Sequence, residues 1–305
     1  MRRVRYGATG GPLFLEEAPV PQPGPGELLV RCEAIGVTLP VVRKVTEAAE
    51  PVPLGGEIAG EVMAVGPGAD RFRAGDRVTG LCFGHGYADY ALLHVGMASP
   101  VPDTATAVEA VALVRSGLVA LGTLEAARPE RGEAALVTAA ASGVGHLAVQ
   151  LARVRGAGRV VGAVSDPAKA GFVRSLGADD VVTYGQESWG EPVDYALDAV
   201  GGDMLSHALA ALTAGGRLVA YSSGGGTIRA YDLLVGAKSV IGFQMARIAR
   251  EEPELYERWR QELWRLFEEG ALKPVVHGEF ALEEATEAHA AIESRVNRGK
   301  VVLHP

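Results

Sequence analysis

The stretch ALVTAAASGVGHLAVQLARVRG, residues 135–156, decides the fold. It opens with a short apolar run, residues 135–137, that is typical of a buried strand. Small residues dominate positions 139–145, and apolar residues then recur at the helical spacing 144, 147, 148 and 151. A strand, a tight turn of small residues and a helix form the opening of a dinucleotide-binding βαβ unit.

The phosphate-binding fingerprint G-x-G-x-x-G is present in this stretch as Ala140-x-Ser142-x-x-Gly145. Its small residues allow a sharp turn, close approach of the backbone to a pyrophosphate, and close packing of helix on strand. The helix that follows offers free N–H groups and the positive end of its dipole to phosphates. Because two of the three glycines are replaced, a strand-to-helix turn without any ligand remains the alternative.

Length, composition and charge restrict the class of protein. The 305 residues suggest about two domains, and 48% hydrophobic with 22% charged residues is ordinary for a globular protein. A net charge of −8 without a basic block argues against a nucleic-acid partner. The start, MRRVRYGATGG, lacks the apolar region of a signal peptide, and no uninterrupted apolar run approaches the ~18 residues of a membrane span.

Cysteine and histidine usage argues against a metal centre. The only cysteines, Cys32 and Cys82, provide neither a disulfide framework nor, by themselves, a thiolate zinc site. The seven histidines include no pair at i and i+4. We therefore expect no metal site, and a reducing, cytoplasmic location.

The pattern of elements predicts two domains of different class. Residues 1–110 are β-rich, with strands expected at 28–37, 58–66 and 76–83 between Pro-Gly turns, as in a small barrel or sandwich. A mostly apolar helix is expected over 106–127. Residues 134–243 then alternate strand and helix, which predicts a parallel, doubly wound sheet. The expected strands are 134–139, 159–164, 180–184, 193–198, 216–221 and 238–243, and the expected helices are 143–155, 167–176 and 203–213.

The C-terminal part is expected to complete the first domain. Pro253 predicts the first turn of a helix that runs to residue 269. Its apolar stripe, which includes Trp259 and Leu263, is interpreted as core or interface. A helix over 282–293 and a last strand return to β character. We therefore expect a catalytic domain of residues 1–115 completed by 244–305, and a nucleotide-binding domain of residues 116–243.

The end of the second strand indicates which cofactor is bound. The strand ends on Val164, where an NAD enzyme places a carboxylate for the ribose hydroxyls. Ser165 and Lys169 follow instead, a hydroxyl and a cation suited to a 2′-phosphate, and they favour NADPH. The adjacent Asp166 leaves NAD as the alternative, and Lys169 also fits a solvated helix position. The missing acidic residue argues against a methyltransferase.

Two further residues can be assigned structural roles. Asp198, after the fourth strand, is interpreted as the cap of a turn rather than as a catalytic acid. Ser142 lies in the phosphate turn and lacks the G-x-S-x-G elbow of a hydrolase.

The whole chain resembles the medium-chain dehydrogenase/reductases, in their zinc-free quinone oxidoreductase (ζ-crystallin-like) branch. The resemblance rests on VPQPGPGELLVRCEAIGV, IAGEVMAVGPGADRFRAGDRVTG, GYADYALL, TAAASGVGHLAVQLA, SLGADDVVTY, LDAVGGDMLSHALAALTAGGRLV and RGKVVL. It implies an α/β fold with a GroES-like β-barrel catalytic domain made from both ends of the chain. A Rossmann domain with a doubly wound parallel sheet is then inserted between them.

The resemblance also implies which residues hold the cofactor. The 2′-phosphate of NADPH is expected at Ser165, Lys169, Tyr184 and Arg295, and the distance of Arg295 along the chain implies a closure between domains. Further cofactor contacts are implied at Ala140, Ser142, Gly143, Val144, Gly145, Val200, Ser222 and Phe243.

Two positions decide the expectation about zinc. Zinc-dependent members of the family carry a Cys after G-[IV] and a His in G-H-E, and these positions are Thr38 and Gly56 here. The four-cysteine lobe is missing as well. Zinc-free relatives carry Asn followed by Asp and Tyr, where this chain has Thr38, Val41 and Arg43, and a Thr near the nicotinamide is replaced by Val119. These departures leave open which substrate is bound, and they do not affect the expectation that the cofactor is NADPH.

The resulting hypothesis is hydride transfer from nicotinamide C4 to a quinone or an α,β-unsaturated carbonyl compound. Without zinc, hydrogen-bond donors must meet the charge that develops on the carbonyl oxygen. Thr38 is the first candidate and Arg43 the second, and Tyr87 matches a pocket-lining position of the family. The alternative for Thr38 is a hydroxyl bonded to the backbone, and the alternative for Tyr87 is a half-buried strand aromatic.

Two further expectations concern turnover and assembly. The rival function is an NADPH-binding protein, a sensor or structural protein, with little or no turnover. The family implies a homodimer formed through the last Rossmann strand, VIGFQ, and an exposed apolar edge of that kind invites pairing.

Overall fold

The computed structural model describes residues 1–221 and 224–305. The chain divides into two compact units, residues 1–115 with 274–305, and residues 116–273. The expected change of domain at residue 115 coincides with this division. Residues 244–273, which we expected in the first domain, lie in the second unit instead.

The first unit is built on a sheet to which both ends of the chain contribute. Over the described residues the order is β14-β15-β3-β4-β5-β7, and β6 also pairs with β3. The strands are β3 (Glu27–Val37), β4 (Gly56–Val65), β5 (Arg77–Cys82), β6 (Tyr90–His94), β7 (Ser99–Pro100), β14 (Val276–Ala281) and β15 (Lys300–His304). Because β15 pairs antiparallel with β3, the C-terminal strand completes the first unit.

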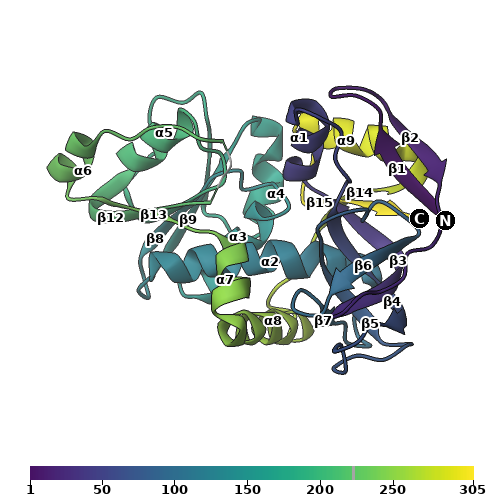
Figure 1. Cartoon of the computed structure of the whole chain (residues 1–305). Helices are drawn as coiled ribbons and strands as arrows, with labels where there is room; N and C mark the ends of the chain where they lie inside the picture. Colours follow the sequence, from purple (N-terminus) through teal and green to yellow (C-terminus); the bar gives the residue numbers. More distant parts are fainter. Residues whose placement is uncertain (222–223) are drawn as a thin grey trace. The chain divides into compact units, whose positions relative to one another are not determined.

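Smaller elements cover this sheet. β1 (Arg2–Tyr6) and β2 (Leu13–Glu17) form an antiparallel hairpin. The helix α1 (Leu39–Glu47) begins directly after β3 and lies beside α9 (Ala285–Glu293), which follows the short η2 (Leu282–Glu284) (Figure 1). Fully buried apolar side chains such as Leu28, Ile35 and Ile58 fill the core between these layers.

The second unit is a Rossmann domain. Its six strands are all parallel and follow the order β10-β9-β8-β11-β12-β13. They are β8 (Ala134–Val137), β9 (Arg159–Val164), β10 (Asp180–Thr183), β11 (Val193–Asp198), β12 (Leu212–Ala220) and β13 (Ser239–Gly242). The order reverses direction between β8 and β11, which is the topological switch point where such sheets bind ligands.

Helices connect these strands in the expected alternation. They are α3 (Gly145–Val154), η1 (Pro167–Lys169), α4 (Ala170–Ser175), α5 (Met204–Ala210) and α6 (Ala230–Gly236). The prediction of an α/β fold with a GroES-like domain and a doubly wound parallel sheet is therefore confirmed.

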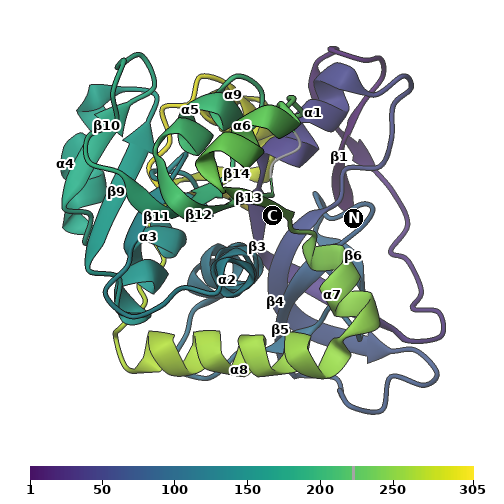
Figure 2. The same ribbon diagram turned by 90° about the vertical axis from the view of Figure 1, so that its left-hand side faces the viewer.

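Packing against α2 (Ala107–Ala127) explains why residues 244–273 belong to the second unit. The helices α7 (Met245–Glu251) and α8 (Pro253–Glu268) contain this segment, and Figure 2 shows α8 running beneath α2, which is seen end-on. A Cβ on Gly117 of α2 would lie 2.9 Å from Leu263 Cδ2, so the two helices pack closely there. The ring of Trp259 lies 6.5 Å from that of Phe243, and both border Gly122. The apolar stripe of α8 is thus core, as interpreted.

α2 has one further property. Among the described residues it is the one helix long and apolar enough to cross a membrane, with a mean hydropathy of 1.6 over an 18-residue window. Glu109 and Arg115 interrupt its apolar run. In the structure 78% of that window is buried inside the protein, as in the core helix of a folded domain.

Candidate active site

The turn after β8 is built as the fingerprint requires. Ala140 N donates to Ala163 O at 3.1 Å, which ties the turn to β9. Ser142 Oγ accepts a 3.0 Å hydrogen bond from Gly145 N at the start of α3. A Cβ on Gly145 would lie 2.8 Å from Ala139 C, so only glycine lets α3 pack this closely on the turn. The N-terminus of α3 is thus held at the carboxyl end of β8, where it can bind phosphate.

Ala139 is the strained residue of this turn. Its φ of 48° lies in the left-handed region, which costs a residue with a Cβ roughly 1–2 kcal/mol. Its backbone nitrogen donates a 2.9 Å hydrogen bond to the hydroxyl of Tyr184, the residue that follows β10. Tyr184 therefore holds the phosphate turn in place. The family resemblance implies only a contact of this tyrosine with the 2′-phosphate, and no local sequence pattern indicates its bond to Ala139.

The residues after β9 are arranged for a phosphate rather than for a bare ribose. Ser165 is exposed directly after the strand. Asp166 Oδ1 accepts a 2.8 Å hydrogen bond from Ala168 N and caps η1, so one oxygen of this carboxylate is engaged locally. Lys169 ends η1 and is buried, unlike the solvated helix residue of the alternative interpretation.

Asp198 organises the turn that follows β11. It is fully buried and accepts hydrogen bonds from Thr138 Oγ1 at 2.7 Å and from Gly201 N at 2.8 Å. Its interpretation as a turn cap is confirmed. Val200 N lies 3.4 Å from Asp198 Oδ1 within the same turn.

Other expected cofactor residues have different surroundings. Phe243 packs against Trp259 and follows β13, while Ser222 lies outside the described residues. Arg295 is exposed after α9 in the first unit, whereas Ser165, Lys169 and Tyr184 belong to the second. Tyr221 directly follows β12 in the structure; it is the last residue of the strand predicted over 216–221, and the sequence gives it no role of its own.

The substrate candidates of the first unit lie around the start of α1. Thr38 is the N-cap residue of this helix, but its side chain makes no capping hydrogen bond. Its backbone oxygen accepts from Val41 N and Val42 N at 3.0 and 3.1 Å. Arg43, one turn further on, has Nε 3.5 Å from Glu47 Oε1. The half-buried Thr38 side chain thus has no role in the local cap.

Tyr87 lies in the core of the first unit. It is 1% exposed, and its hydroxyl lies 3.3 Å from Nε2 of His289 on α9. Burial lowers the pKa of His289 to about 4. A Cβ on Gly56 would lie 3.3 Å from Tyr87 Cε1, so the tyrosine ring stands directly beside the position where zinc-dependent relatives carry their histidine.

A buried ion pair lies close to these residues. Lys300 Nζ contacts Glu57 Oε2, and both side chains are almost completely buried. A Cβ on Gly36 would lie 2.7 Å from Lys300 Cε, so the pair packs against the end of β3, two residues before Thr38. Burial lowers the pKa of Lys300, and the carboxylate of Glu57 opposes this effect.

No metal centre is visible in the part of the chain that the structure describes. Over residues 1–221 and 224–305, no three or more His, Cys, Asp or Glu side chains come together in a way that can hold a metal ion. The donor set at Thr38 and Gly56 supplies no nitrogen or sulfur ligand for zinc.

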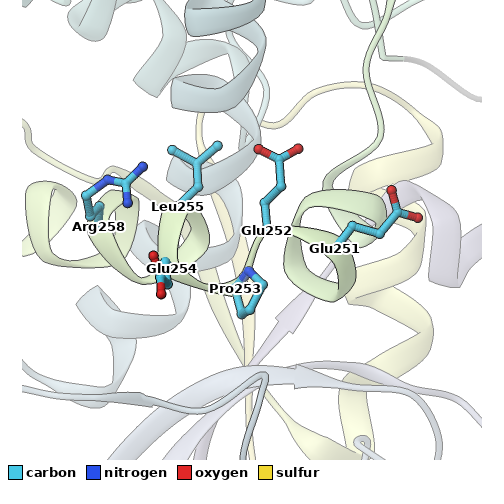
Figure 3. Close-up of a pocket in the computed structure, with 6 residues that line it drawn as sticks. All are labelled: Glu251, Glu252, Pro253, Glu254, Leu255 and Arg258. Atoms are coloured by element: carbon cyan, nitrogen blue, oxygen red, sulfur yellow. The ribbon is translucent and has the colours of Figure 1, made fainter.

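A shallow pocket of about 330 Å³ lies elsewhere, where α7 meets α8 (Figure 3). Glu252 and Leu255 project to the same side in this view, and charged side chains dominate the lining. Ligand sites are mainly apolar with a few polar groups. No residue of the phosphate turn lines this pocket, so it is separate from the candidate cofactor site.

A GroES-like unit built from both chain ends and an inserted Rossmann unit define the class of the medium-chain dehydrogenase/reductases. Comparisons with known proteins agree. The model of the alcohol dehydrogenase GroES-like domain matches residues 24–115, and that of the zinc-binding dehydrogenase matches residues 176–303.

Individual relatives narrow this class. The chain is 32% identical to the quinone oxidoreductase of Pseudomonas aeruginosa over 326 residues, which covers 100% of this chain and 99% of that protein. A mycobacterial protein solved in complex with NADPH superposes with a TM-score of 0.93 at 31% identity, over 100% of both chains. The quinone oxidoreductase of Escherichia coli, also solved with NADPH, gives a TM-score of 0.91 at 27% identity over the same coverage. The chain belongs to the quinone oxidoreductases of the medium-chain dehydrogenase/reductase superfamily.

Proposed function

We propose that this protein is an NADPH-dependent reductase that transfers hydride to a quinone or an α,β-unsaturated carbonyl compound. The observation that carries the proposal is the phosphate turn of Ala140, Ser142 and Gly145 at the switch point of the sheet. Relatives of the same fold have been solved with NADPH. When bound, NADPH supplies a hydride from C4 of its nicotinamide ring.

The residues present fit this cofactor. The turn and the N-terminus of α3, with Gly143 and Val144, would hold the diphosphate. Ser165 and the buried cation Lys169 would hold the 2′-phosphate, with Tyr184 and Arg295 as further partners. Because Asp166 already caps η1, its carboxylate is less suited to bind ribose hydroxyls as in an NAD enzyme.

The reduction is proposed to proceed without zinc. Supporting this, Thr38 and Gly56 stand at the positions of two zinc ligands of the family, and the ring of Tyr87 lies beside Gly56. Hydrogen-bond donors must then stabilise the charge on the substrate's carbonyl oxygen. Thr38 is the first candidate because its hydroxyl is not used in the helix cap, and Arg43 is the second. Tyr87 would border the substrate site near Thr38 through its ring.

The assembly is proposed to be a homodimer through β13. This strand is the edge of the Rossmann sheet, and Val240 on it is 36% exposed. On the neighbouring α6, Tyr231, Leu234 and Val235 are all exposed. Sedimentation should give a dimer for the wild type and a monomer for Val240→Lys, with the exposed Phe14→Lys on β2 as the control that stays dimeric. A monomeric wild type would contradict this assembly.

A reducing, cytoplasmic location remains a proposal as well. Cys32 and Cys82 are free and buried. Cys32 lies opposite Gly60 of β4, and Cys82 lies opposite Gly56 of the same strand. These two positions are four residues apart along β4, and the cysteines form no disulfide.

NADPH oxidation by the chelator-treated protein tests the function, with a panel of small quinones and a panel of enones. Oxidation with either panel supports a reductase and identifies the substrate class. Tight NADPH binding without oxidation in both panels would instead support the binding protein without turnover. Val41 and Arg43, which depart from the family pattern, favour that second candidate.

A further inference from the structure

Two tyrosine hydroxyls of the second unit are buried without a hydrogen-bond partner among the described residues, those of Tyr195 and Tyr221. A buried polar group left without a partner destabilises the folded protein. Such a group is therefore expected to have a reason, such as a ligand that supplies the missing partner.

The two tyrosines lie at different parts of the sheet. Tyr195 is inside β11, opposite Ala135 of β8 and Arg217 of β12, and the Arg217 guanidinium lies 5.9 Å from its ring centre. Tyr221 directly follows β12, and its backbone nitrogen donates to Asp198 O at 3.1 Å. Only Tyr221 therefore lies at the carboxyl edge, where a doubly wound sheet binds its ligand.

The surroundings of the Tyr221 hydroxyl point to the switch point. Burial raises its pKa, and the nearby Asp198 carboxylate and Tyr184 hydroxyl raise it further. Both oxygens of Asp198 already accept hydrogen bonds, from Thr138 and Gly201. Tyr184 in turn accepts the hydrogen bond from Ala139 N. These neighbouring groups bond elsewhere, and none of them forms a hydrogen bond with the Tyr221 hydroxyl.

The strand order makes this convergence specific. In the sheet order β10-β9-β8-β11-β12, β10 lies two places from β8 on one side and β12 lies two places from it on the other. Tyr184 follows β10 and Tyr221 follows β12. The two tyrosines therefore reach toward the end of β8 from the two halves of the sheet. Ser165 and Lys169 follow β9, so the β9 half receives the adenosine 2′-phosphate in the proposed function. Tyr221 comes from the other half.

We propose that the Tyr221 hydroxyl binds the nicotinamide half of NADPH, donating its hydrogen bond to the ribose or to the phosphate attached to that ribose. This inference rests on the proposed function and names a residue of the same site. The hydroxyl is left without a partner in the free protein so that the cofactor can supply one.

Tyr221→Phe and Tyr195→Phe form a matched pair for the test, because each removes one buried, unpartnered hydroxyl from the same unit. Calorimetric titration measures the affinity for NADPH and for adenosine 2′,5′-bisphosphate, which lacks the nicotinamide half. Urea unfolding without ligand measures the stability of each variant. Circular dichroism shows whether both variants are folded.

Tyr221→Phe should weaken NADPH binding about tenfold, the loss of one hydrogen bond worth about 1.4 kcal/mol. It should leave the affinity for the bisphosphate unchanged and the free energy of unfolding equal or higher. Tyr195→Phe should change neither affinity.

Each contrary outcome has its own meaning. A wild type that binds no NADPH overturns the proposed function and this inference with it. A wild type that binds while Tyr221→Phe binds equally well overturns only the inference. Equal losses for NADPH and the bisphosphate contradict the assignment to the nicotinamide half. A Tyr221→Phe protein that is destabilised, with unchanged NADPH affinity, shows that the hydroxyl has a partner within the protein.

Discussion

The hydroxyl of Tyr184 accepts a 2.9 Å hydrogen bond from the backbone nitrogen of Ala139, and so joins the end of β10 to the phosphate turn after β8. The sequence suggests for this tyrosine only a contact with the cofactor. In the structure it also supports the turn on which the cofactor is proposed to lie.

Removing the Tyr184 hydroxyl should therefore lower the stability of the folded protein even without a cofactor. Tyr184→Phe leaves Ala139 N without its partner, and we expect the free energy of unfolding to fall by about 1–3 kcal/mol. Urea unfolding of the ligand-free protein measures this change. A variant as stable as the wild type would show that water replaces the hydroxyl.

Ala139 itself offers the opposite change. Its φ of 48° favours glycine, so Ala139→Gly should raise the free energy of unfolding by up to about 1 kcal/mol once the greater flexibility of the unfolded chain is included. Ala140→Gly, at the next residue of the turn, whose φ is not positive, serves as the control and should be destabilising. Destabilisation by Ala139→Gly would contradict a strained turn.

The buried pair Glu57–Lys300 joins β4 to β15 and can be compared with the exposed pair Arg31–Glu61, which joins β3 to β4. Lys300→Met leaves Glu57 buried without a partner and should cost about 3–5 kcal/mol of stability. The double variant Glu57→Leu/Lys300→Met should recover most of this loss. Arg31→Met breaks the exposed Arg31–Glu61 pair and should cost less than about 1 kcal/mol. Thermal unfolding of the four proteins tests the comparison, and a double variant no better than Lys300→Met would contradict it.

His289 should make stability depend on pH. Its pKa is about 4 in the folded protein and 6.5 ordinarily, so the unfolded chain binds an extra proton between these values. Stability therefore rises with pH from 4 to 6.5 and falls as the protein is acidified, by a total of about 3 kcal/mol. Urea unfolding at several pH values should show a flatter profile for His289→Gln. An unchanged slope would mean that His289 titrates alike in both states.

Lys169 should set the coenzyme preference. Lys169→Met removes the buried cation proposed to meet the 2′-phosphate, and NADPH affinity should fall about 10–100-fold while NADH affinity changes little. Arg174→Met on α4, an exposed cation nearby, is the matched control. Equal losses for both coenzymes would assign Lys169 a structural role.

Periodicity and turn residues were sufficient to predict most of the second unit. β9 and β11 have the predicted bounds, and the helix from Pro253 differs from its prediction by one residue. The hairpin β1–β2 and the helix α1 were missed because they are only five to nine residues long, too short for a period to stand out, although Val41, Val42 and Val45 of α1 are spaced as on one helical face. The placement of residues 244–273 was wrong for a different reason, since the contact of Trp259 with Phe243 depends on tertiary packing.

The candidate site was predictable where local chemistry decides it. The phosphate turn, Ser165 and the Asp198 cap follow from residue type and position relative to a strand. The contacts Tyr184–Ala139 and Tyr87–His289 join residues far apart in sequence, and no local pattern indicates them. The unpartnered hydroxyl of Tyr221 is visible only once every neighbouring donor and acceptor has been placed.

A crystal structure of the protein grown with NADPH tests the central claim most directly. We predict the diphosphate at the N-terminus of α3, beside Ser142 and Gly145, and the 2′-phosphate beside Ser165 and Lys169. A coenzyme bound elsewhere, a carboxyl edge of the sheet filled by side chains in the presence of saturating NADPH, or a zinc ion beside Thr38 would contradict it.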